Sequence, residues 1–560
     1  MDNYQIADCF SLLAKLMDIH GENSFKAKSY ATAAFNIEKL TMQLSEVATD
    51  KLFGIKGIGE STGKKVIELL ATGELKVLAE MIEKTPKGVM EMLNIKGIGP
   101  KKIATIWREM EIESIGELLY ACKENRLKLY KGFGEKTQQN VIETIEFYLK
   151  SKGSFLYSQI DTMQEALKSF FIKLFDENKI AFTGAFKRQL EIIHELDIVI
   201  DETIQDIENK LAAVEDFELV EKNEQDLLYR ASVGLKFRIY SCAGTSIIEM
   251  AFVRGCSTEF AAKFSQQFPS IDYANCITEA TIFEQAGLHF IPACQRESVD
   301  VIRTAIQQPL PPLLKAGDIK GIIHSHSNWS DGSSTIEEMA NHAIAEGFEY
   351  LVISDHSRSA FYANGLKPER IREQHHYIDE LNARFAPFKI FKSIESDILN
   401  DGSLDYSNEI LATFDLVIAS VHSNLKMTEE KAMLRLMNAI ENPYTTILGH
   451  MTGRLLLSRK GYPVDHKRII DACAANNVVI ELNAHPSRLD VDWRHIEYAL
   501  EKNILISIDP DAHSPEGFHD IRYGVLVAQK AMVTKESNLS SFGLNKLLVY
   551  LSERKKLKHI

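Results

Sequence analysis

The 560-residue sequence predicts a multidomain chain that combines α+β and α/β parts. Three observations lead to this class. A Gly-x-Gly repeat occurs three times between helical patterns before residue 150, and strand-like and helix-like runs mix between residues 151 and 310. After residue 318, seven strand-like runs alternate with helical ones, which predicts a parallel α/β barrel. The length itself favours several domains.

The composition is that of an ordinary globular protein, with 45% hydrophobic and 25% charged residues. Because the chain has no run of 18 apolar residues and no basic-then-apolar N-terminus, we expect neither a membrane partner nor a signal peptide. The seven cysteines form no CxxC pair, which suits a reducing cytoplasm. The net charge is −14, but residues 51–150 carry 17 Lys and Arg against 14 Asp and Glu, so a basic surface for nucleic acid is compatible with the sequence.

The N-terminal repeat is typical of helix–hairpin–helix turns. Its copies lie in FGIKGIGESTGKKVIELL (53–70), LNIKGIGPKKIATIW (93–107) and YKGFGEKTQQNVIETI (130–145). Two glycines allow a tight turn that opens a helix, and the free N–H groups of that helix can hold a DNA backbone phosphate. The alternative, that Gly-x-Gly only joins helices, is disfavoured by the three copies. The expected DNA-binding residues are Gly57, Gly59, Lys64, Lys65, Gly97, Gly99, Lys101, Lys102, Gly132, Gly134 and Lys136.

The middle of the chain is predicted to be mixed α/β. We interpret LDIVI (196–200), GLKFRIYSC (234–242) and IIEMAFV (247–253) as strands. Glu195 and Asp197 then point to the same side of one strand, where two carboxylates need a cation or a proton between them. The Pro-rich stretch IQQPLPPLLKAGDI (306–319) is a candidate linker.

Every strand-like run after residue 318 ends in a polar or His-bearing segment. In parallel α/β barrels the functional groups lie at the carboxyl ends of the strands. The expected metal ligands there are His324, His326, Asp331, His356, Glu395, His422, His450, Asp511 and His513. These imidazoles and carboxylates are enough for three divalent ions with open positions, and they suit Mn²⁺, Zn²⁺ or Fe²⁺ better than Mg²⁺. Arg454, in GHMTGR, is a candidate phosphate clamp, and an ordinary surface arginine is an equal alternative.

Residues 318–560 resemble a PHP (polymerase and histidinol phosphatase) domain, because all nine metal positions of that family's pattern are filled. The resemblance implies a distorted (β/α)7 barrel with a trinuclear site, in which metal-bound water, as hydroxide, attacks a phosphoester. It also implies the ligand sets: His324, His326, Glu395 and Asp511 for one metal, Glu395, His422 and His450 for a second, and Asp331, His356 and His513 for a third.

The first 310 residues resemble bacterial family X DNA polymerases, and the order of the two parts is the bacterial PolX arrangement. The resemblance rests on SFKAKSYATAA (24–34), the three hairpins, TGAFKRQLEIIHELDIVI (183–200) and GLHFIPACQRES (287–298), whose Ala293, Cys294 and Gln295 depart from the family. The implied domains are a lyase-like helical domain with the first hairpin (1–85), a fingers-like hairpin domain (86–150), a nucleotidyltransferase palm (151–243), a thumb-like domain (244–305), a linker (306–317) and the PHP metallo-hydrolase domain (318–560).

The palm is predicted to have lost its nucleotidyl-transfer site. The residues at the family's site positions are Gly184, Ala185, Arg188, Glu195, Asp197 and Lys236. By this resemblance Ala185 replaces a serine that holds the triphosphate, and Lys236 in LKFRIY (235–240) falls at the third Asp position. A lysine there would pair with the two carboxylates and displace the metal that activates the primer 3′-hydroxyl. We therefore expect polymerase activity to be weak or lost.

The same resemblance places Lys65 at the position of a Schiff-base lyase lysine, although we favour a phosphate contact for it and for Lys64. The sequence thus predicts a PolX-type DNA repair protein of the bacterial cytosol and nucleoid. It does not determine the oligomeric state, for which we favour a monomer. We expect a Mn²⁺-dependent 3′→5′ exonuclease acting on gapped, nicked or 3′-ended duplexes, with cleavage at abasic sites as an option. The alternatives are a gap-filling polymerase with PHP proofreading, a PHP phosphomonoesterase and a non-enzymatic DNA-binding scaffold.

Overall fold

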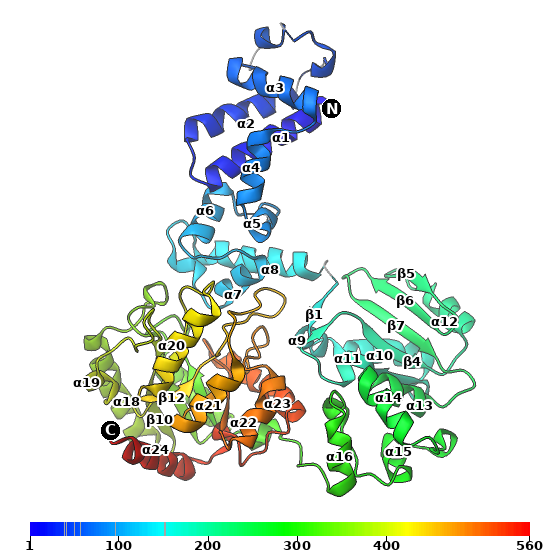
Figure 1. Cartoon of the computed structure of the whole chain (residues 1–560), viewed down its shortest axis with the longest axis vertical. Helices are drawn as coiled ribbons and strands as arrows, with labels where there is room; N and C mark the ends of the chain where they lie inside the picture. The colour runs from blue at the N-terminus through cyan, green and yellow to red at the C-terminus, as the bar shows by residue number, and fades with distance from the viewer. Residues whose placement is uncertain (39, 41, 50, 56–57, 96, 151–152) are drawn as a thin grey trace. The chain divides into compact units, whose positions relative to one another are not determined.

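The computed structural model describes residues 1–38, 40, 42–49, 51–55, 58–95, 97–150 and 153–560 (Figure 1). The chain forms two compact units. One contains Met1–Lys123 and Leu127–Glu146, and the other contains Glu124–Arg126 and Phe147–Ile560. Among the described residues, no helix has the length and apolar character that crossing a membrane requires.

The first unit is helical, as the sequence predicts. Its elements are α1 (Asn3–Ile19), α2 (Ser24–Glu38), η1 (Leu44–Glu46), η2 (Leu52–Gly54), α3 (Glu60–Thr72), α4 (Lys76–Lys84), α5 (Lys87–Met92), α6 (Pro100–Arg108), α7 (Ile115–Lys123), η3 (Leu127–Leu129) and the greater part of α8 (Glu135–Lys150). A capping box between Asp2 and Gln5 begins α1. Phe10 of α1 packs on Tyr30 of α2, and burial of these rings holds the first two helices together.

The second unit begins with a mixed sheet in the order β2-β4-β7-β6-β5, in which only the β4–β7 pair is parallel. Its strands are β2 (Ile180–Thr183), β4 (Leu196–Ile200), β5 (Phe217–Lys222), β6 (Asp226–Ala231) and β7 (Lys236–Ser241). The short strands β1 (Phe155–Leu156) and β3 (Ile192–Ile193) pair separately. The accompanying helices are α9 (Tyr157–Asp161), α10 (Gln164–Phe175), α11 (Gly184–Lys187), α12 (Ile204–Leu211), α13 (Ile247–Arg254), α14 (Thr258–Gln267), α15 (Glu279–Gln285) and α16 (Asp300–Gln307).

One predicted strand is wrong. IIEMAFV (247–253) lies in helix α13, not in a strand. The hydroxyl of Ser246 accepts a hydrogen bond from the backbone N–H of Glu249, which caps the first turn of the helix. A short apolar run fits a strand and a buried helix equally well by periodicity, and the capping serine was the signal that the prediction overlooked.

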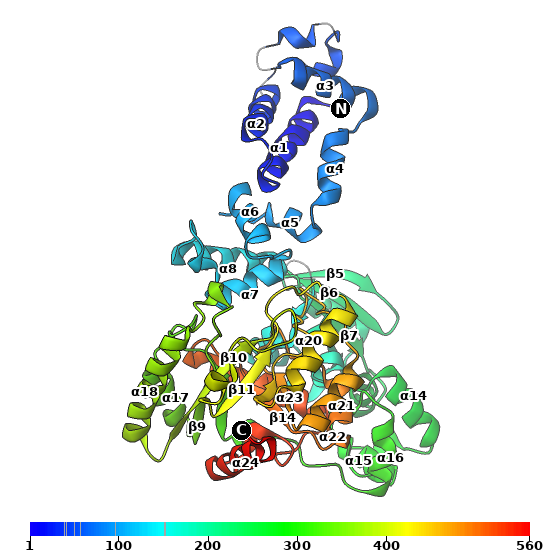
Figure 2. The ribbon, with the colours of Figure 1, turned by 60° about the vertical axis from the view of Figure 1, so that its left-hand side comes forward.

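The C-terminal part is a seven-stranded parallel sheet in the order β14-β13-β12-β11-β10-β9-β8. Figure 2 labels β9, β10, β11 and β14 of this sheet. Its strands are β8 (Gly321–Ser325), β9 (Tyr350–Ile353), β10 (Lys389–Asp397), β11 (Leu416–Ser420), β12 (Thr445–Leu448), β13 (Val479–Asn483) and β14 (Ile506–Asp509). The helices between and after them are α17 (Ile336–Ala345), α18 (Pro368–Phe385), α19 (Asn408–Leu411), α20 (Glu429–Glu441), α21 (His466–Asn476), α22 (Trp493–Glu501), α23 (Ile521–Lys530) and α24 (Leu544–Lys558). A parallel bridge between Ser325 and Ala512 brings the two ends of the sheet together, so the barrel is nearly closed and the predicted fold class is confirmed.

Candidate metal centre

The nine predicted ligands all lie at or just beyond the carboxyl ends of the barrel strands. Eight of these residues are buried, and the side chain of the ninth, His422, is only 5% exposed. His324 and Asp511 have positive φ angles of 61° and 54°, a left-handed backbone that side chains other than glycine rarely adopt. Such strain clusters at functional sites, and here it accompanies the bridge at which the first and last strands meet.

The first cluster joins His324 and His326 to two carboxylates. The Nε2 atom of His324 lies 3.3 Å from Oε1 of Glu395 and 3.5 Å from Oδ1 of Asp511. The Nε2 atom of His326 lies 3.1 Å from the same Asp511 oxygen and 3.6 Å from Oε2 of Glu395. Ligand atoms of His324, His326 and Asp511 all lie within 4.8 Å of one another, and both oxygens of Glu395 border this group.

Glu395 extends the site to a second cluster. Its Oε1 atom lies 3.1 Å from Nε2 of His422 and 3.0 Å from Nε2 of His450. The same oxygen approaches His324, so one carboxylate faces three imidazoles from three different strands. This is the arrangement expected of a carboxylate that bridges two cations.

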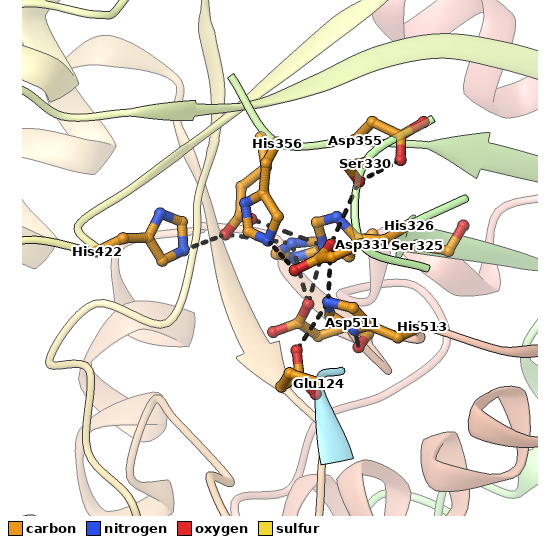
Figure 3. A network of polar contacts seen from close by, with 12 residues as sticks. Glu124, Ser325, His326, Ser330, Asp331, Asp355, His356, His422, Asp511 and His513 are labelled. Carbon is orange, nitrogen blue, oxygen red and sulfur yellow. Dashed lines mark hydrogen bonds and ion pairs between the residues drawn. The ribbon is translucent and has the colours of Figure 1, made fainter. Parts of the chain in front are cut away.

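The third cluster surrounds Asp331, in the loop after β8. Its Oδ2 atom lies 3.5 Å from Nε2 of His356, and its Oδ1 atom lies 3.4 Å from Nε2 of His513 (Figure 3). The ring of His326 stacks against His356 and against His513, with ring centroids 4.3 Å apart in both pairs. His326 therefore borders the third cluster as well as the first, which the sequence did not predict.

Outer carboxylates orient the imidazoles, and the sequence analysis missed them. Oε2 of Glu481 lies 2.6 Å from Nδ1 of His324, and Oδ1 of Asp397 lies 2.5 Å from Nδ1 of His422. A carboxylate that accepts the Nδ1–H proton directs the Nε2 lone pair toward the cluster. Both acids lie in strand-end segments, Glu481 in IELNA and Asp397 in SIESDI, so their position was the available signal.

The electrostatics follow from burying many ionisable groups together. Burial would raise the pKa of Glu395, but His422, His324 and His356 hold that pKa well below its usual range. Burial opposes protonation of His356, yet Asp331 and Glu395 raise its pKa to about 10. Burial, followed by repulsion from His513 and His356, lowers the pKa of His326 to about 4. The carboxylates are thus ionised and require positive charge among them.

The donor atoms fit metal ions better than they fit one another. Several buried side-chain atoms in the described part of the chain have no hydrogen-bond partner although they face the clusters. They are Nε2 of His324, His356 and His513, Oδ2 of Asp331 and Oε2 of Glu395. Buried polar atoms are normally paired, and unpaired ones indicate an ion or a ligand. Together with the mixed imidazole and carboxylate chemistry, they indicate a site for more than one metal ion.

Three family models match the chain in order. The model of the "Helix-hairpin-helix domain" matches residues 1–75. The model of the "SAM-like Helix-hairpin-helix tandem" matches residues 89–146, and the model of the "PHP domain" matches residues 323–485. A curated relative, "DNA polymerase/3′-5′ exonuclease PolX" of Bacillus subtilis (strain 168), is 29% identical over 98% of this chain and 99% of its own length. The chain matches a bacterial PolX with a C-terminal PHP domain.

Other relatives match only part of the chain. A probable phosphatase of Caldanaerobacter subterraneus subsp. tengcongensis is 27% identical over 42% of this chain and 91% of its own length. A probable phosphatase of Thermoanaerobacter sp. (strain X514) is 26% identical over 42% of this chain and 94% of its own length. The chain is therefore similar both to a full-length PolX and to smaller hydrolases.

In the PolX-type palm, Gly184 is required by packing. Its φ is +66°, and a Cβ atom there would lie 1.6 Å from Oδ2 of Asp197. The backbone N–H of the following Ala185 donates to Asp197. Nε of Arg188 donates to Glu297 at 2.7 Å, and one terminal nitrogen of Arg188 donates to the carbonyl of Cys256 at 3.1 Å. The arginine predicted to hold a triphosphate is thus engaged by neighbouring protein groups.

The predicted partner of the palm carboxylates is corrected. The register of β4 and β7 places Arg238, not Lys236, opposite Asp197. Nε of Arg238 lies 2.9 Å from Oε1 of Glu195, and its Nη1 atom lies 2.7 Å from Oδ1 of Asp226. The predicted position was wrong by two residues along β7. Residues two apart in a strand share a face, and the sequence alone did not fix the register. A fixed positive charge still stands beside the carboxylate pair.

Asp197 itself lacks a cationic partner at hydrogen-bonding distance among the described residues, and the Tyr240 hydroxyl approaches it only at 3.4 Å. Burial, followed by repulsion from Glu195, raises the pKa of Asp197 to about 6. Arg238 therefore neutralises Glu195. Burial and the charge of Glu195 disfavour the ionised form of Asp197.

The hairpin glycines adopt the expected turns where the structure describes them. Gly97 and Gly132 have φ angles of 95° and 93°, and Gly59 and Gly99 are the N-cap residues of α3 and α6. Helix α8 begins directly after Gly134, and an added Cβ would meet no atom within 4 Å at any of these five positions. Gly57 lies outside the described residues. The helix starts are thus open to a ligand.

The predicted lysines follow these turns. Nζ of Lys64 lies 2.7 Å from Oε1 of Glu60, one helical turn away. Nζ of Lys102 lies over the ring of Phe133, 5.4 Å from the ring centroid. Lys101 and Lys136 are exposed. The role of Lys65 in lyase chemistry stays a prediction.

Arg454 is engaged within the barrel rather than directed at the clusters. Its Nη1 donates to Asp492, and its Nε donates to the carbonyl of Arg488 at 3.0 Å. Arg488 is closer to the metal centre, with Nε 3.8 Å from Oδ2 of Asp511, and it is buried. These contacts oppose a clamp role for Arg454, whereas Arg488 lies beside the ligand Asp511.

Proposed function

We propose that the chain is a metal-dependent DNA phosphodiesterase whose chemistry takes place in the PHP barrel, as a Mn²⁺-dependent 3′→5′ exonuclease. The single observation that carries the proposal is the buried set of nine ligand residues whose unpartnered donor atoms face three adjoining clusters. The substrate follows from the helix–hairpin–helix matches, since such turns bind DNA backbones. The name of the Bacillus subtilis relative, which includes a 3′-5′ exonuclease, supports the same activity.

The proposed ligand sets share Glu395. His324, His326 and Asp511 join it at the first metal, and His422 and His450 join it at the second. The third metal takes Asp331, His356 and His513. When bound, such ions acidify water, neutralise phosphate oxygens and stabilise the leaving alkoxide.

The chain's own residues prepare this site. Glu481 and Asp397 accept the Nδ1–H protons of His324 and His422, which fixes the tautomers that present Nε2. The buried walls exclude water and strengthen every interaction of a bound phosphodiester with the charged groups. The hairpins of the first unit hold the DNA by its phosphates, and the palm contributes little or no nucleotidyl transfer because Arg238 stands beside Glu195.

The test is digestion of 3′-labelled and 5′-labelled duplexes with Mn²⁺, comparing wild type with His450→Ala. Successive shortening from the 3′-end that His450→Ala abolishes supports the proposal. Equal nuclease activity in both proteins contradicts it, because a contaminant would then be the nuclease. Dialysis against a chelator is expected to abolish activity, and added Mn²⁺ is expected to restore it in wild type only.

A second candidate is hydrolysis of phosphomonoesters, which the two probable phosphatases favour. Rates on a nitrophenyl monoester and on DNA, measured at the same Mn²⁺ concentration, separate the two candidates. Faster cleavage of DNA supports the nuclease, and faster cleavage of the monoester supports the phosphatase. We further propose that the protein acts as a monomer on gapped, nicked or 3′-ended DNA in the bacterial cytosol.

A further inference from the structure

One buried carboxylate in the metal centre comes from outside the barrel. Residues Glu124–Arg126 follow helix α7, and they pack with the second unit although the residues on both sides belong to the first. Asn125 has a φ of 57°, a left-handed conformation that turns the chain sharply between α7 and η3. Glu124 thereby reaches the centre, where Figure 3 shows its carboxylate facing His513.

The geometry of Glu124 is that of the other ligands. Its Oε2 atom lies 2.8 Å from Nε2 of His513, which is shorter than the 3.4 Å between that nitrogen and Oδ1 of Asp331. Glu124 is 3% exposed, and Oε2 has no hydrogen-bond partner in the described part of the chain. Ligand atoms of Glu124, Asp511 and His513 all lie within 4.8 Å of one another.

A buried carboxylate is costly unless positive charge meets it. Burial would raise the pKa of Glu124, but His513 holds that pKa below its usual value. The neighbouring Arg126 lies on Asp331, with Nε 3.8 Å from Oδ2, and over the ring of Tyr362 at 5.1 Å. The segment is therefore seated on the third cluster by two side chains, not by Glu124 alone.

We propose that Glu124 is a further ligand of the third metal ion, supplied by the α7–η3 segment. This inference rests on the proposed metal site. Asp331 and His513 are provided by loops after β8 and β14, and Glu124 brings a second carboxylate to the same imidazole nitrogen. Glu124 then completes the hydrolytic centre within the second unit.

The test is metal binding by the full-length protein. Glu124→Gln keeps the size of the side chain but is a much poorer ligand for Mn²⁺. Equilibrium dialysis over a range of Mn²⁺ concentrations, followed by elemental analysis, gives the number of ions per chain and their affinities. We expect Glu124→Gln to weaken one equivalent by at least about 10-fold. Glu536→Gln, an exposed residue in a loop, is the matched control and should bind Mn²⁺ like wild type.

His513→Ala separates the two proposals. If His513→Ala loses one equivalent and Glu124→Gln binds Mn²⁺ like wild type, the ligand role of Glu124 is overturned while the metal site stands. If wild type binds no Mn²⁺, the proposed function and this inference are both wrong. Circular dichroism on the metal-free proteins shows whether each variant is folded. The inference is also overturned if Glu124→Gln is folded, hydrolyses DNA faster and keeps its metal content. In that case the Glu124 side chain would block the substrate-binding position instead of binding a metal ion.

Discussion

Arg238 of β7 donates from Nε to Oε1 of Glu195, 2.9 Å away, directly beside the palm carboxylate Asp197. A guanidinium is permanently charged, so it occupies the electrostatic position that a divalent cation needs. The carboxylate pair Glu195 and Asp197 therefore already has a cation of the protein beside it.

The first prediction concerns this pair. On a one-nucleotide gap, we expect dNTP incorporation at least about 10²-fold below that of the Bacillus subtilis relative, because Arg238 puts a fixed positive charge beside Glu195 and Asp197, where the catalytic cation would bind. Asp197→Ala should leave any residual signal unchanged. The measurement is primer extension under identical conditions. Robust extension that Asp197→Ala abolishes would show an active polymerase.

The second prediction concerns Asp197 and stability. Its folded pKa of about 6 lies above the ordinary value of 3.8, so between these pH values the folded state holds a proton that the unfolded state has lost. Stability therefore falls as pH rises from about 4 to 6, by up to about 3 kcal/mol. Asp197→Asn should raise the melting temperature at pH 7.5 and lose that advantage below pH 4.

Asp226→Asn is the control for this measurement. Asp226 accepts from Arg238 at 2.7 Å, so its neutralisation removes a partner and should not stabilise the protein at pH 7.5. Equal shifts in both variants would argue against a penalty specific to Asp197.

The third prediction concerns the outer carboxylates of the metal centre. Asp397→Asn leaves Nδ1 of His422 without its anionic acceptor, and we expect Mn²⁺ affinity to fall by about 10- to 100-fold. Metal content after dialysis is the readout. Asp379→Asn, on the outer helix α18, breaks only a surface pair with Lys392 and should retain wild-type affinity. Identical affinities in the two variants would deny Asp397 an orienting role.

The fourth prediction concerns the second hairpin. Lys101 follows the Gly97–Gly99 turn and is exposed. If it contacts one phosphate, Lys101→Ala should weaken DNA binding and reduce the slope of log K against log salt by about 0.9. Fluorescence anisotropy at several salt concentrations measures that slope. Lys535→Ala, in an exposed loop of the second unit, should leave the slope unchanged, and a change there would point to a general charge effect.

The sequence predicted the barrel and its strand-end ligands because each lies in a local pattern. An apolar run ending in His or Asp fixes both the strand and the side chain's place on it, so His422 and His450 could be named without a structure. Arg238 could not be placed, since the pairing register of β4 and β7 depends on contacts between distant segments. Glu124 follows no strand, and only the fold brings it to His513.

Helix α13 was mistaken for a strand because that prediction also relied on a local pattern. Its apolar run satisfies a local strand pattern, but the sheet places β7 next to β4 and packs residues 247–254 as a helix. A local sequence pattern predicts an element well where adjacent strands of the sheet are also consecutive in the sequence, as in the barrel. It predicts an element less well where the chain crosses over, as between β4 and β7.

The position of Glu395 predicts how successive metal ions bind to the centre. One of its carboxylate oxygens faces His324, His422 and His450 together, so the first ion to bind fixes the rotamer that the second requires. We therefore expect the first two ions to load cooperatively, with a sigmoidal dependence on Mn²⁺, and the protein to exist mainly as empty or doubly loaded molecules at low metal supply.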